Sequence, residues 1–241
     1  MSPSYKWARL HLGYRNLSYS NYTLAGRMFF GAGIDLNPGK FRFSAMYGRF
    51  QQASLRDTTR NTFSSLPSSF RRMGYAVKVG VGSSQNFIDL IYTKAWDEEN
   101  SIKIPIAEGI TPAENTTLGI VSQLTFFKKI TWSTDVGVSG YTSDVNAKDL
   151  TGTISLDSEF LKKLFLLKRS TQVGYAANSS LRFSSRFASL QVQYRLISTD
   201  YKSMGAYFFN NDVQEILFSP SFSFWQGRIN LSGSYGIQRQ P

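Results

Sequence analysis

Hydrophobic and polar residues alternate along eleven short segments of this chain, and the connections between the segments are tight and long in turn. A period of two is typical of β-strands that have one apolar and one polar face. The first three strands are predicted at about 5–14, 25–36 and 41–50, and the other eight between residues 73 and 237. Long connections are predicted at about 51–70, 97–114, 142–170 and 198–211.

Five tight turns test whether these strands form one sheet. Because side chains alternate, the length of a turn decides whether the apolar faces of its two strands coincide. The faces coincide in all five hairpins, which predicts antiparallel neighbours in chain order and a single β domain over residues 1–241. The turns are at 37–40, 83–86, 127–129, 185–186 and 226–227, and the expected pairs are Leu36 with Phe41, Val81 with Ile88, Phe126 with Ile130, Phe183 with Ala188 and Phe224 with Ile229.

The second face of these strands is rich in glycine, serine and other small polar residues. Such residues suit the lumen of a barrel whose apolar face contacts lipid. The predicted fold is therefore all-β, an antiparallel up-and-down transmembrane β-barrel with about eleven strands present, short turns on one side and long loops on the other. A lipocalin-like soluble barrel with its apolar face inward is the alternative. In the membrane orientation, lipid contacts Tyr75, Val77, Val79, Leu190, Val192 and Tyr194, and an arginine is tolerated better at Ala76 than at Val77.

The amino-acid composition further limits the classes of protein to which this chain can belong. No run of 18 apolar residues is present, so a transmembrane helix is not expected. Aromatic residues make up 15% of the chain, as the girdles of a membrane barrel would require. The formal net charge of +11 comes from dispersed basic residues, without the basic run of a nucleic-acid arm, and no nucleic-acid partner is expected. There are no cysteines, which excludes disulfides and thiolate metal sites.

Charged and amide side chains on the polar face are the candidate lumen-lining residues. On this face seven basic residues outnumber four acidic ones, two of which are Asp35 and Glu215, which predicts a mildly basic lumen with a weak anion preference. The candidates are Arg9, His11, Arg27, Arg42, Arg72, Lys78, Asp89, Asp135, Arg182, Gln191, Gln193 and Arg195.

Catalytic, metal and cofactor chemistry is not indicated. His11 is the single histidine and has no nucleophile signature around it, so the protein is not expected to be an enzyme. The carboxylates of Asp97, Glu98 and Glu99 lack the ligand alternation of a calcium site and are expected to be solvated loop charges. Residues 157–165 carry apolar side chains at helical spacing, which predicts a short loop helix on the barrel rim.

The ends of the chain differ from those of a complete outer-membrane barrel. Residues 1–7 lead directly into a strand pattern without a charged region and an apolar stretch, and residues 237–241 contain no terminal aromatic. The interpretation is a fragment in which the signal peptide and the terminal strands are absent.

Four stretches carry a family resemblance: Ser18–Gly26, Asn37–Arg49, Thr111–Gly119 and Lys202–Asn211. With the overall strand pattern, they resemble poorly characterised, porin-like outer-membrane β-barrel proteins of Bacteroidota-type bacteria. The resemblance implies a bacterial outer-membrane location, next to lipid bilayer and lipopolysaccharide, and implies no activity. The expected function is a porin-like or transport channel for small solutes. The alternative is a non-enzymatic scaffold whose surface loops bind a secretion or cell-surface partner.

Overall fold

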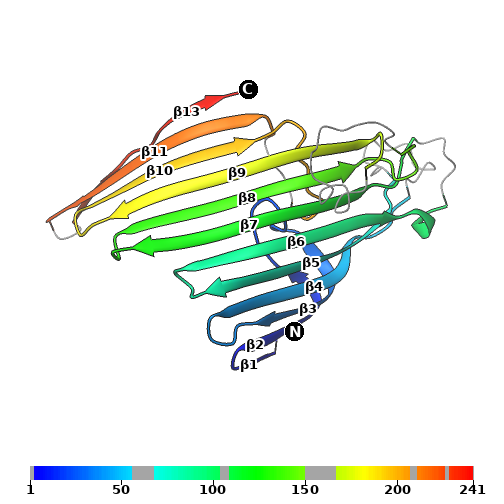
Figure 1. The fold of residues 1–241 in the computed structure, drawn as a ribbon, viewed down its shortest axis with the longest axis horizontal. Helices are drawn as coiled ribbons and strands as arrows, with labels where there is room; N and C mark the ends of the chain where they lie inside the picture. Colours follow the sequence, from blue (N-terminus) through cyan, green and yellow to red (C-terminus); the bar gives the residue numbers. More distant parts are fainter. Residues whose placement is uncertain are drawn as a thin grey trace.

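A computed structural model of the chain describes residues 3–55, 68–103, 109–149, 167–206, 211–225 and 228–240. These residues form one antiparallel sheet of thirteen strands (Figure 1). The 3₁₀ turn Glu99–Ser101 follows β6, and no helix in the described part of the chain is long and apolar enough to cross a membrane. The strands are β1 (Ser4–Tyr5), β2 (Ala8–Asn16), β3 (Met28–Leu36), β4 (Phe41–Gln51), β5 (Arg71–Gly82), β6 (Phe87–Glu98), β7 (Glu114–Phe126), β8 (Ile130–Thr142), β9 (Thr171–Ser184), β10 (Ala188–Ile197), β11 (Val213–Phe224), β12 (Ile229–Ser232) and β13 (Tyr235–Arg239).

The strands pair in chain order, which confirms the predicted up-and-down topology. The first predicted strand divides into β1 and β2, and the last divides into β12 and β13, both of which pair with β11. The eleven predicted segments thus all lie in the sheet. Among the described residues the sheet is curved but not closed, since β1 does not pair with β12 or β13 (Figure 1).

Three of the five predicted hairpin pairs are confirmed: Val81 with Ile88, Phe126 with Ile130 and Phe224 with Ile229. The other two predictions are wrong by two residues.

Leu36 pairs with Phe43, and Phe183 pairs with Leu190. In each case a hydrogen-bonded turn occupies the residues before the strands meet: Phe41 N–H donates to Pro38 (3.2 Å) and Ser185 N–H to Ala188 (2.8 Å). Because the shift is even, every side chain remains on its predicted face.

One face of the sheet is an exposed band of large apolar side chains. Val79, Leu190 and Val192, which were expected to face lipid, are 42%, 37% and 40% exposed. Aromatic rings stand out at the tight turns, at Phe41, Phe127, Phe187 and Trp225. An apolar surface of this extent, with aromatics at its rim, is the lipid-facing side of a transmembrane barrel.

The connections at the opposite edge of the sheet are long and link residues 16–28, 51–71, 98–114, 142–171 and 197–213. Tight turns lie together at one edge and long loops at the other, as predicted. The helix expected at 157–165 and the turn at 226–227 lie outside the described residues.

Candidate functional site

Two of the long connections fold back onto the other face of the sheet, here called the inner face. Residues 17–26 and 198–206, together called the plug, bury Tyr22, Thr23, Leu24, Tyr201 and Met204 almost completely. The plug therefore covers part of the inner face, which the sequence predicted to be a polar lumen. Residues 16–23, which lie before β3 and include Tyr19 and Tyr22, were a sequence signal for this feature.

The two plug segments bind each other although they are about 180 residues apart in the chain. Tyr201 Oη donates to the Tyr22 carbonyl (2.7 Å), and the two rings meet edge to face with centroids 6.0 Å apart. Ser203 Oγ donates to the Thr23 carbonyl (2.8 Å), and Ala25 N–H donates to Gly205 (3.1 Å). The plug is thus one interlocked unit.

Polar side chains of the sheet hold the plug in place. Asp135, on β8, accepts hydrogen bonds from Ser20 Oγ (2.6 Å) and from Asn21 N–H (2.9 Å). Asn115, on β7, accepts from Met204 N–H (2.9 Å) and donates to the Lys202 carbonyl (3.3 Å), to which Ser139 also donates. Asp135 was predicted to line the lumen, and in the structure its carboxylate binds the plug from the inner face.

Glycines of the inner face make room for the plug. A Cβ at Gly119 would lie 2.6 Å from Thr23 Cγ2, and one at Gly137 would lie 2.7 Å from Tyr201 Oη. A Cβ at Gly174 would lie 2.5 Å from the backbone N and Cα of Tyr201. Small residues here had indicated a lumen, and their positions show that they admit the close approach of a second backbone.

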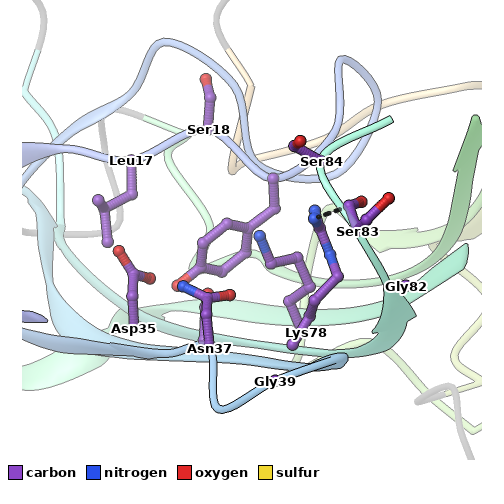
Figure 2. A pocket seen from close by; sticks show the side chains of 12 residues that line it. Leu17, Ser18, Asp35, Asn37, Gly39, Lys78, Gly82, Ser83 and Ser84 are labelled. Atoms are coloured by element: carbon purple, nitrogen blue, oxygen red, sulfur yellow. Dashed lines mark hydrogen bonds between the residues drawn. The ribbon is translucent and has the colours of Figure 1, made fainter. Parts of the chain in front are cut away.

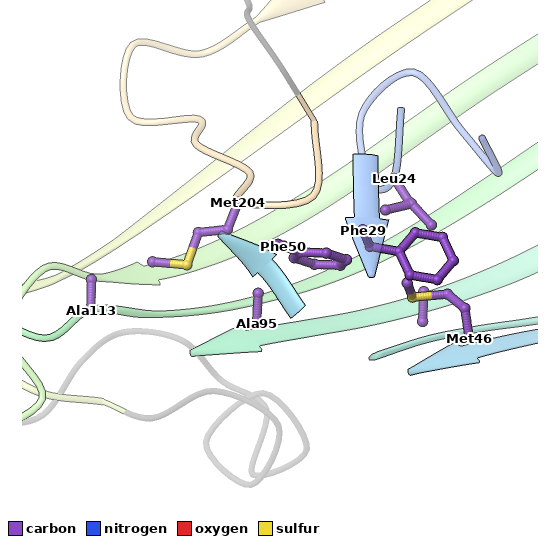
Figure 3. Close-up of a cluster of buried hydrophobic side chains, with 8 residues drawn as sticks. Leu24, Phe29, Met46, Phe50, Ala95, Ala113 and Met204 are labelled. Atoms are coloured by element: carbon purple, nitrogen blue, oxygen red, sulfur yellow. The ribbon is translucent and has the colours of Figure 1, made fainter. Parts of the chain in front are cut away.

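An apolar cluster forms the centre of the contact between plug and sheet (Figure 3). Leu24 and Met204 of the plug pack with inner-face side chains that include Phe29, Met46 and Phe50. Ala76 belongs to the same cluster and is fully buried, so the prediction that it tolerates arginine better than Val77 loses its basis. The alternation of the strands did not reveal these inner apolar residues, because the covering segments come from elsewhere in the chain.

Most of the predicted lumen charges are paired with an opposite charge. Arg42 binds Asp89 through Nε and Nη2, both at 2.8 Å, and Arg195 binds Glu215 at 2.6 Å. His11 is buried on β2, and its Nε2 lies 2.8 Å from Asp35 Oδ2. These ion pairs neutralise their charges locally, so the positive excess rests on cations without a carboxylate partner among the described residues, such as Lys78 and Arg182.

The prediction that the carboxylates of residues 97–99 are solvated loop charges is wrong for two of them. Asp97 and Glu98 belong to β6 rather than to a loop. Asp97 accepts from Arg72 Nε (2.7 Å) and Nη2 (3.0 Å), with its side chain only 5% exposed, and Glu98 accepts from Arg71 Nε (2.5 Å). Asp97 thus adds a carboxylate to the inner face, and Arg15, cross-strand from buried Phe29, adds a cation. Sequence reasoning missed both.

The remaining predicted residues bind neutral partners, line a cavity or are exposed. Arg182 donates to the Gln191 side-chain oxygen (3.1 Å from Nε), and Gln193 donates to Asn178 (2.9 Å). Arg27 donates to Gln51 (3.2 Å), and Arg9 is exposed near the tight-turn end of β2.

A cavity of about 440 Å³ lies on the inner face at the tight-turn side of the plug (Figure 2). Its walls come from the turns at 37–39 and 82–84, from plug residues 17–19, and from the inner-face side chains of Asp35, Arg42, Ser44 and Lys78. A second cavity of about 390 Å³ lies among the long loops and is lined by Arg72, Asp97 and Tyr141. The plug thus has a polar space on each side.

Burial changes the acidity of the plug tyrosines. It raises the pKa of Tyr22 to about 12, with the nearby charge of Asp135 as a second cause. Burial also raises the pKa of Tyr201. Both rings therefore stay neutral well above the ordinary tyrosine pKa. Within the described residues, no group of three or more His, Asp or Glu side chains has the arrangement of a metal site.

Comparison with known proteins supports the fold. No protein-family model and no curated protein sequence matches the chain. Among solved structures, the chain is similar to Pseudomonas aeruginosa OccK8 (OprE), an outer-membrane porin barrel, with a TM-score of 0.52 and 10% sequence identity. The match covers 98% of this chain and 64% of OccK8. The chain therefore has the fold of a porin-type antiparallel barrel and spans less than two thirds of the length of that protein.

Proposed function

We propose that this chain is a porin-like, non-enzymatic channel of the bacterial outer membrane, with a mildly basic lumen that passes small solutes. Its surroundings are then lipid and lipopolysaccharide, and its long-loop side is extracellular. The observation that carries this proposal is the division of the sheet into two faces. The outer face is an apolar band, whereas the inner face carries ion pairs and has polar cavities on both sides of the plug.

The plug has the properties of a removable barrier. Its segments are joined to each other by single hydrogen bonds, each of which contributes about 0.5–1.5 kcal/mol. Hydrogen bonds and the apolar cluster around Leu24 and Met204 join it to the sheet. The buried hydroxyls of Thr23, Thr93 and Thr117 have no hydrogen-bond partner among the described residues, which weakens this interface. Rearrangement of the plug would connect the two cavities without breaking the sheet.

Conductance across a planar lipid bilayer tests the proposal. The purified chain is expected to give steady current steps, and Asp135→Ala, which removes two anchors of the plug, is expected to increase their size or frequency. Gly233→Ala is a suitable control, because its added Cβ would meet no atom within 4 Å. If neither the wild type nor Asp135→Ala conducts, the scaffold alternative is favoured, in which the long loops bind a secretion or cell-surface partner.

A further inference from the structure

The cavity of Figure 2 contains opposite charges that do not pair with each other. Lys78 and Asp35 both line it, from β5 and β3, and the two labelled side chains extend into the same space (Figure 2). No ion pair joins them. We propose that this cavity binds a small zwitterionic solute that carries both a carboxylate and an ammonium group, as an amino acid does.

Lys78 is the group that would bind the carboxylate. Its side chain is half-buried, and its ammonium lies 5.0 Å from the centre of the Tyr19 ring of the plug. Among the described residues its ammonium makes no hydrogen bond and no ion pair. A partly desolvated ammonium without a hydrogen-bonded carboxylate is unfavourable, and an oxyanion that enters the cavity would relieve that cost.

Neighbouring charges explain why Lys78 forms no ion pair with the described residues. Asp89, the inner-face carboxylate two residues along the sheet, is bound by both Nε and Nη2 of Arg42. Asp35 is held through Oδ2 by His11, and its side chain also lines the cavity. The protein therefore places a fixed positive and a fixed negative group at separate points of one wall.

The charge balance favours a zwitterion over a simple anion. Lys78 and Arg42 contribute two positive charges, and Asp35 and Asp89 contribute two negative charges, so the local sum is zero while His11 is neutral. A ligand with a net negative charge would be attracted by Lys78 and repelled by Asp35. A ligand with both charges gains at both ends, and the Asn37 amide and the Ser84 hydroxyl offer further hydrogen bonds.

The inference depends on the proposed channel only for the route by which the solute arrives. Binding can be measured without conductance, by calorimetric titration of the detergent-solubilised full chain. The probes are L-alanine, which carries both charges, and acetate and methylammonium, which carry one each. Alanine is expected to bind saturably, and each single-charge probe about ten-fold or more weaker, because a charged hydrogen-bonded contact is lost.

Two variants locate the site. Lys78→Met is expected to weaken alanine binding by about ten-fold or more while methylammonium binding stays unchanged, and Asp35→Asn should weaken methylammonium. Arg182→Met removes a different inner-face cation and should leave alanine binding as it is. The comparison of the three probes on the wild type needs no variant, so a poorly folded Lys78→Met protein would not prevent the test.

Each contrary result has a definite meaning. Acetate binding as tight as alanine binding would overturn the zwitterion site, and so would Lys78→Met protein that binds alanine like the wild type. A chain that conducts but does not prefer alanine leaves the channel standing without this site. A chain that prefers alanine but never conducts contradicts the channel alone.

Discussion

The close approach of the plug to Gly174 gives a direct test of the inner-face architecture. In Gly174→Ala, the added Cβ would lie 2.5 Å from the N and Cα of Tyr201 and 2.7 Å from the carbonyl carbon of Asp200. Ordinary contact begins at 3.4 Å, so a displacement of about 0.9 Å is needed. The opposing atoms are backbone and cannot rotate away, and therefore the plug segment itself must move.

The loss of plug stability in Gly174→Ala can be estimated from this geometry. Overpacking of a close contact destabilises by about 1–3 kcal/mol, which is comparable to one or two of the hydrogen bonds that hold the plug. The strand is the firmer partner, because β9 pairs along its length with β8. The substitution is thus expected to loosen residues 198–206 and leave the sheet intact.

Hydrogen–deuterium exchange measured by mass spectrometry reads out this loosening. A change of 1–3 kcal/mol corresponds to about a 5- to 150-fold faster exchange of the protected plug amides, such as that of Met204. Peptides from β5 and β6 should be unchanged. Gly233→Ala is the matched control, since its Cβ would meet no atom within 4 Å. Unchanged protection of the plug in Gly174→Ala would refute the close packing of Tyr201 against Gly174.

Four further predictions follow from the same structure. Val77→Arg, on the lipid-facing side, should lower the free energy of unfolding in lipid by about 2–4 kcal/mol, and Ser180→Arg, on the inner face, by much less; equal losses in denaturant titrations would contradict the orientation. Asp135→Ala should speed exchange at residues 20–22, because two hydrogen bonds to a charged group, worth about 1.5–3 kcal/mol each, are lost; Asp135→Asn should retain part of the protection. The contribution of Tyr22 to plug stability should be fully present below its unfolded pKa of about 10, and should be lost as pH rises towards its folded pKa of about 12. Bilayer conductance of the wild type should therefore increase over this pH range, and that of Tyr22→Phe should increase less. Arg182→Glu should shift the reversal potential towards cations at low salt, because Arg182 has no carboxylate partner among the described residues, and a shift that persists at 1 M salt would argue against screening of a lumen charge.

The charges of the inner face show which part of the predicted anion preference follows from the sequence. Adding Arg15 and Asp97 to the strand residues gives eight cations and five carboxylates, so the sequence-based excess of three positive charges is retained. The distribution is nevertheless different from the expectation. Arg42, Arg72 and Arg195 are tied to carboxylates, which leaves Lys78 and Arg182 as better candidates to act on a passing solute.

Local sequence determined the strands, their order and the face of every strand residue. These properties depend on a period of two and on the length of each turn, and both are written in neighbouring residues. Even where Leu36 and Phe183 pair two residues away from the expected position, the faces agree, since an even shift preserves the alternation. The same reasoning explains why the outward apolar band could be predicted without a structure.

Tertiary structure alone decided what occupies the inside. The plug joins residues 17–26 to 198–206, and no periodic pattern connects segments so far apart in the chain. Gly137 and Gly174 look like lumen residues in the sequence, and only the position of Tyr201 shows that they accommodate a packed backbone. Likewise, the alternation puts Lys78 and Asp35 on one face of the sheet. The cavity that both residues line forms only when the sheet curves and the plug folds against it. The same is true of the contacts that hold Asp35 and Asp89.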